Sequence, residues 1–160
     1  MDMHKHNPSS QEEHHGHERH DQHAHPHGAR VTAGFGTRSA EEYPSERTLE
    51  RLLPGVQNHE SIWLAVLGWQ TWGQRHDEFS RLETWAERAR WIDQNTEGED
   101  LLFREYDRGL EAEGRRHLVV FDALDRTSEA PVVRRTLLRA LLRVTLRALS
   151  WKALRAKAFV

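Results

Sequence analysis

The chain has 160 residues, a formal net charge of −2 and no cysteine. This length suits one modest domain and a tail, the near-neutral charge gives no general attraction to nucleic acid or anionic lipid, and the lack of cysteine excludes disulfides, thiolate zinc sites and cysteine nucleophiles. No apolar stretch is long enough for a secretion signal or a membrane span, so we expect a cytoplasmic protein with no membrane partner.

Residues 1–29 form a polar segment that contains most of the chain's 12 histidines. Ordering it would cost backbone entropy without burying apolar surface, so we predict a disordered histidine-rich tail. Histidines two positions apart on an extended chain project to the same side, which makes His23, His25 and His27 candidate ligands for Zn²⁺, Ni²⁺ or Cu²⁺. A solvated low-complexity extension without metal is the alternative.

Residues 30–160 are predicted to form one α/β domain, because strands and helical segments alternate along the chain. Val31 and Ala33 begin an alternating pattern that predicts a strand over 30–35. The apolar run 118–121 predicts a second, buried strand, and residues 156–160 predict a third. A long helical insertion, over about 45–114, separates the first two strands.

Within the insertion, three helices are expected from apolar spacing and capping residues. One begins at Asn58, one spans about 80–94 with Asn95 and Gly98 as stop signals, and one spans about 99–113.

A further helix carries Pro131 in its first turn. Its predicted core rows are Leu137, Leu138, Leu141, Leu142, Thr145 and Leu149. A row of arginines, Arg135, Arg139, Arg143 and Arg147, is expected to be a solvated face, so nucleic acid is not the expected partner.

The second strand ends in the most informative motif of the chain. Four apolar residues stop abruptly at Asp122, and a second acid, Asp125, follows three positions later. A buried parallel strand presents the residue after it at the sheet edge where ligands gather.

This motif, residues 118–125, resembles the Walker B segment of P-loop NTPases, particularly NACHT-like signal-transducing ATPases, in which a small and a hydrophobic residue separate two acids. The resemblance implies a partial P-loop NTPase sheet of about three parallel strands. It also implies ATP and Mg²⁺ as ligands, with Asp122 on the Mg²⁺ side and Asp125 orienting or activating the attacking water. The strands would be two, three and four of that fold, leaving one sheet edge open to a protein partner or to self-association.

The phosphate-binding half of such a site is missing. A phosphate loop needs Gly-x-x-x-x-Gly-Lys-Ser/Thr, and no glycine here is followed by lysine. The sequence therefore predicts an incomplete, truncated NTPase core whose ancestral activity is ATP or GTP hydrolysis and which hydrolyses ATP poorly alone. The alternative prediction is a histidine-rich metal-binding or interaction protein with a structural α/β scaffold.

Overall fold

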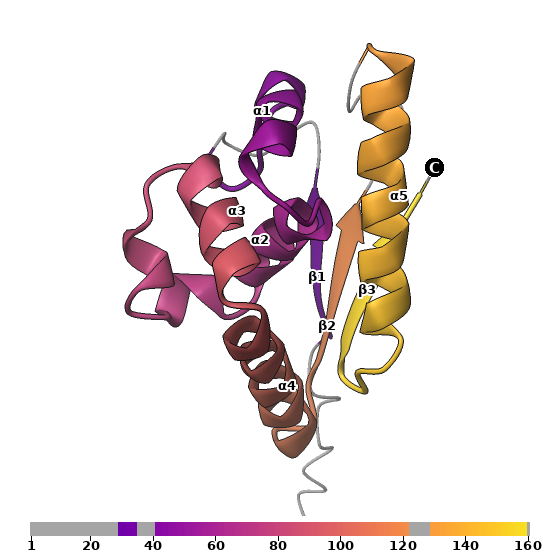
Figure 1. Ribbon diagram of the computed structural model, residues 1–160. Helices are drawn as coiled ribbons and strands as arrows, with labels where there is room; N and C mark the ends of the chain where they lie inside the picture. Colours follow the sequence, from indigo (N-terminus) through magenta and orange to yellow (C-terminus); the bar gives the residue numbers. More distant parts are fainter. Residues whose placement is uncertain (1–28, 35–40, 122–128, 160) are drawn as a thin grey trace, which may run out of the picture.

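A computed structural model describes residues 29–34, 41–121 and 129–159 (Figure 1). Its centre is a parallel sheet of β1 (Ala29–Gly34), β2 (Arg116–Phe121) and β3 (Leu154–Ala158), in the order β1-β2-β3. The predicted α/β class and the parallel arrangement are confirmed. The predicted third strand was placed two residues too late.

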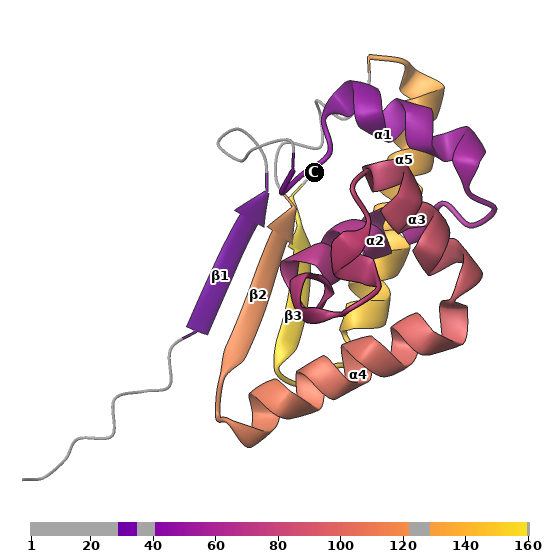
Figure 2. The same ribbon diagram turned by 90° about the vertical axis from the view of Figure 1, so that its left-hand side faces the viewer.

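Five α-helices accompany the sheet: α1 (Glu46–Leu52), α2 (Glu60–Gln70), α3 (Trp85–Gln94), α4 (Thr96–Ala112) and α5 (Pro131–Ala148). Short 3-10 helices lie at Leu53–Gly55, Gly73–Arg75 and Phe79–Arg81. Figure 2 shows all five α-helices on the same side of the sheet. The connection from β1 to β2 and the connection from β2 to β3 both step in the same direction across the sheet. Because such crossovers are right-handed, their helices lie on the same face. Among the described helices, none combines the length and apolarity that crossing a membrane requires.

Capping residues explain where several helices begin and end. Asn58 accepts the backbone N–H of Glu60 at 3.0 Å, in keeping with the predicted start of α2. Pro131 occupies the first turn of α5, as predicted, where its missing N–H costs nothing. Gly114 ends α4 with φ at 65°, a left-handed conformation that glycine adopts without strain.

Three predictions about the helical insertion are wrong. The second helix begins at Trp85 rather than near residue 80, because Thr84 and Glu87 form a reciprocal capping box that starts α3. Gly98 is not a stop signal, since it lies in the first turn of α4, and that helix starts three residues earlier than predicted.

The core of the helical insertion is aromatic. Trp72 packs against Phe79, Phe103 and Trp91, with ring centroids 5.0 to 6.1 Å apart. Phe103 in turn stacks on Trp151 at 5.1 Å, which connects the insertion to the turn before β3. Offset and edge-to-face aromatic pairs of this kind add to the stabilisation from burial alone.

The described sheet is covered on one face only. Along β2, the side chains of His117, Val119 and Phe121 are buried, whereas Leu118 and Val120 are half-buried. Along β3, Arg155 and Lys157 are exposed on that same uncovered face, opposite Leu118 and Val120 in the register. Parallel sheets are ordinarily covered on both faces, so this uncovered face is unusual.

A buried carboxylate fixes the turn between α5 and β3. Asp107 of α4 accepts the backbone N–H groups of Lys152, Ala153 and Leu154 at 2.7 to 3.1 Å. These donors would otherwise be left without partners at the start of a strand, which is costly when they are buried. Asp107 therefore sets where β3 begins.

Two glycines make a matched test of this packing. A Cβ on Gly73 would lie 2.7 Å from the ring of Phe79 and 2.8 Å from the carbonyl oxygen of Gly68, whereas a Cβ on Gly109 would meet nothing within 4 Å. We expect Gly73→Ala to destabilise the protein by about 1–3 kcal/mol through overpacking. Gly109→Ala should stabilise it by about 0.5–1 kcal/mol through helix propensity.

Urea unfolding followed by circular dichroism measures both changes in the free energy of unfolding. A Gly73→Ala protein as stable as the parent would contradict the packing described for the aromatic core.

Candidate functional site

The carboxyl edge of the sheet is the candidate site, because the three parallel strands end there together. The register aligns Gly34 with Phe121, and Phe121 with Ala158. The first turns of α5 lie at the same end of the molecule (Figure 2). Ligands of open α/β sheets bind in the space beyond the carboxyl ends of the strands.

Asp122 follows Phe121 directly in the sequence, at the end of the central strand. Both predicted acids, Asp122 and Asp125, fall in the segment 122–128, outside the described residues. Their assigned roles in binding Mg²⁺ and water stay predictions. The predicted strand that precedes them is confirmed, with two more residues at its start.

Two contacts hold the end of this strand, and a third joins α2 to α5 beside it. The buried ring of Phe121 meets Trp63 of α2 edge to face, with centroids 5.7 Å apart. The indole Nε1–H of Trp63 donates to the carbonyl oxygen of Leu137 in α5 at 2.8 Å. The backbone N–H of Phe159 donates to the carbonyl oxygen of Phe121 at 2.9 Å. Sequence analysis missed this junction, because its members are far apart in the chain and only their apolar character was visible.

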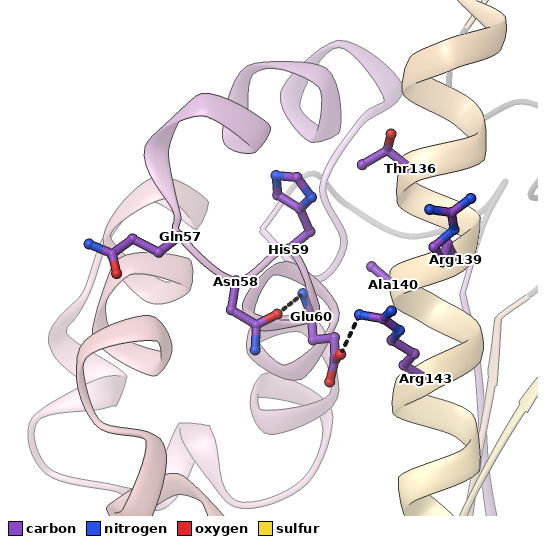
Figure 3. A pocket seen from close by; sticks show the side chains of 8 residues that line it. All are labelled: Gln57, Asn58, His59, Glu60, Thr136, Arg139, Ala140 and Arg143. Carbon is purple, nitrogen blue, oxygen red and sulfur yellow. Dashed lines mark hydrogen bonds and ion pairs between the residues drawn. The ribbon is translucent and has the colours of Figure 1, made fainter.

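A groove of about 400 Å³ lies between the start of α2 and the middle of α5 (Figure 3). It is lined by Gln57, Asn58, His59, Glu60, Thr136, Arg139, Ala140 and Arg143. Glu60 and Arg143 face each other across it at 3.6 Å. Sequence analysis did not identify this groove as a site.

The groove has a positive rim but not the form of a phosphate-binding loop. Arg139 and Arg143 are exposed, and Glu60 offsets one of the two positive charges. Exposed ion pairs in water contribute little binding energy, and salt screens them. None of the lining residues is a glycine or a lysine, so this groove does not replace the missing phosphate loop.

The loop that leads into the groove is anchored by Asp93 of α3. Its carboxylate accepts the N–H groups of Gln57 and Asn58 at 2.8 and 2.9 Å and the hydroxyl of Ser61 at 3.0 Å. Burial alone would raise the pKa of Asp93, but these hydrogen bonds outweigh it and lower the pKa below its ordinary value.

One member of the arginine row is not solvated, contrary to the prediction. Arg147 donates to both carboxylate oxygens of Glu99, at 2.8 and 3.2 Å, and to Asp100 at 2.7 Å. Burial raises the pKa of Glu99, and the hydrogen bond and charge of Arg147 offset that rise only in part. This cluster ties α4 to α5.

The predicted metal ligands of the tail, His23, His25 and His27, also lie outside the described residues. Within the part of the chain that is described, no group of three histidine, aspartate or glutamate side chains is arranged to hold a metal ion. His117 is buried and its Nδ1 lies 2.9 Å from the hydroxyl of Tyr106. This histidine is structural.

Comparison with known proteins adds no assignment: no family model, curated protein or solved structure matches this chain.

The anchor at Asp93 predicts a specific dependence of stability on pH. Because the pKa of Asp93 in the folded protein lies below its unfolded value of about 4, its stabilising effect is complete above that value. The effect is lost as the pH falls through the lower folded pKa. We expect Asp93→Asn to lower the free energy of unfolding near neutral pH by about 1–3 kcal/mol.

Denaturant unfolding at a series of pH values measures this effect. The curves of the parent and Asp93→Asn should converge at the acidic end, whereas Glu105→Gln, which changes an exposed side chain of α4, should follow the parent throughout. A constant difference between parent and Asp93→Asn at every pH would show that the carboxylate charge is not involved.

Proposed function

We propose that this chain is an incomplete P-loop NTPase core that contributes the Mg²⁺-side acid of a nucleotide site. One observation carries the proposal: β2 is the central strand of a parallel sheet and ends at Phe121, so that Asp122 is the first residue after its carboxyl end. This is the position that the Walker B resemblance requires of an acid that holds Mg²⁺ on nucleotide phosphates.

The arrangement of the sheet agrees with an incomplete core. The order β1-β2-β3 is the one expected of strands two, three and four of the P-loop NTPase fold. The described helices cover one face of the sheet and leave Leu118 and Val120 half-buried on the other. A complete doubly wound sheet has helices on both faces, whereas the described helices cover only one face of this sheet.

The chemistry divides between the two acids. Asp122 would hold Mg²⁺ through metal-bound water, and Asp125 would orient or activate the water that attacks the terminal phosphate of ATP or GTP. Bound Mg²⁺ would offset the phosphate charge. Without a phosphate loop the chain would hold Mg-ATP weakly, with a dissociation constant on the order of 1 mM, and hydrolyse it no faster than background.

Metal binding by the tail is the second candidate. The spacing of His23, His25 and His27 favours it, and it would make the α/β part a scaffold. Removal of residues 1–28 would abolish this activity while leaving the binding of Mg-ATP unchanged. Both proposals place the protein in the cytoplasm, because a chain without cysteine needs no oxidising compartment to form disulfides.

Saturation-transfer NMR on ATP, with and without Mg²⁺, tests the nucleotide proposal. We expect weak, Mg²⁺-dependent binding that Asp122→Asn reduces at least fivefold, because one metal-side carboxylate charge is lost. Glu129→Gln, which changes an exposed acid before α5, is the matched control and should bind like the parent.

Circular dichroism checks that each variant keeps the parent fold. Equal binding by the parent and Asp122→Asn would remove the basis for the proposal. Submicromolar binding with turnover would show instead that the chain carries a complete phosphate site.

A further inference from the structure

The outer edge of β3 has backbone groups available for pairing. Within the described residues, β3 pairs with β2 alone. The carbonyl oxygen of Ala153 accepts the backbone N–H of His117, and the backbone N–H of Phe159 donates to the carbonyl oxygen of Phe121. The odd-numbered residues of this segment therefore direct their backbone groups toward β2. Backbone groups alternate along a strand, and therefore the N–H and C=O groups of Ala156 and Ala158 point toward the outer edge.

A leucine stripe on α5 lies beside this edge. Leu142, Leu146 and Leu149 follow one another at helical spacing and are 47 to 68% exposed, although sequence analysis predicted Leu142 and Leu149 for the core. The buried side of α5 is formed instead by Leu137, Ala140, Leu141, Val144 and Ala148.

The stripe lies on the side of α5 that faces away from the core. At about 100° per residue, Leu146 points away from the buried side, and Leu142 and Leu149 lie between it and the flank opposite Arg143 and Arg147. The helix itself packs on β3 (Figure 1). An added strand would therefore bring the side chains of its inner face near Leu142 and Leu149, and Leu146 would stay outside this contact.

The opposite face of the same edge is basic. Lys157 is exposed there, and Arg155 starts from the same face, although its guanidinium reaches back to donate to the carbonyl oxygen of Ala148 in α5 at 3.4 Å. From residue 131 to the end of the chain the sequence contains arginine and lysine but no aspartate or glutamate. A strand added here would meet apolar side chains on one face and positive charge on the other.

We propose that the outer edge of β3 binds a partner strand in which acidic and apolar residues alternate. Its apolar side chains pack against Leu142 and Leu149, its carboxylates pair with Lys157 and Arg155, and its backbone pairs with Ala156 and Ala158. A second copy of this chain fits poorly, because pairing two β3 edges would bring the four cationic side chains together. Strand addition to an open edge is a common mode of peptide recognition.

This binding needs neither nucleotide nor Asp122, so it goes beyond the proposed function and can fail independently of it. The probe is a short blocked peptide of alternating glutamate and valine, titrated into the full ¹⁵N-labelled chain. We expect the largest amide shifts at Ala156 and Ala158, together with slower hydrogen exchange of these two amides. A lysine–valine peptide of equal length should bind at least tenfold more weakly.

Two variants separate the contributions of the two faces. The double variant Arg155→Glu, Lys157→Glu should reverse the preference between the two peptides. The variant Leu142→Gln, Leu149→Gln should weaken both, and since these leucines are exposed, the chain should remain folded, as its amide spectrum will show.

Equal affinity for the two peptides, no binding of either, or shifts centred away from β3 would overturn the proposal. A dimer in sedimentation velocity that Arg155→Glu, Lys157→Glu abolishes would also overturn it, because it would identify a second copy as the occupant.

Discussion

The structure depends on holding β2 between two parallel neighbours while covering one of its faces. Parallel strands cannot be joined by tight turns, so each neighbour requires a long crossover. The helices α1–α4 form the first crossover and α5 forms the second, and both lie on the face that buries Val119 and Phe121. The contact between Trp63 and Phe121, with the hydrogen bond from Trp63 to Leu137, joins the two crossovers above the central strand.

Buried or half-buried carboxylates anchor the segments that connect these elements. Asp93 fixes the entry to α2, Asp107 fixes the start of β3, and Glu99 pairs with Arg147 between α4 and α5. Each carboxylate accepts two or more hydrogen bonds from a segment that is distant in the sequence. These three acids therefore act structurally, which distinguishes them from the acids proposed for the carboxyl edge of the sheet.

The sequence was sufficient for features that depend on local patterns. The apolar run of β2 and the proline at the start of α5 predicted both elements, and alternation predicted β1 to within one residue. The start of α3 was missed because the capping pair Thr84 and Glu87 was overlooked, although this signal was present in the sequence.

Other features could not be predicted from local pattern. The hydrogen bonds from β3 to Asp107 and from Arg147 to Glu99 join residues more than forty positions apart. The exposure of Leu142 depends on what packs beside α5, because a wide apolar arc does not reveal which part of it is covered. For the candidate site, the sequence identified the strand and its edge, while Asp122 and Asp125 lie outside the described residues.

The central claim is that a magnesium nucleotide meets this protein at the carboxyl edge of the sheet. Amide shifts of the ¹⁵N-labelled chain on addition of Mg-ATP test it most directly. The account predicts Mg²⁺-dependent shifts at Phe121, Ala158 and Phe159, which flank the end of the central strand, and none at the opposite ends of the strands, at Arg116 and Leu154. Shifts confined to the groove around Arg139 and Arg143, or no shifts on β2 and β3, would contradict it.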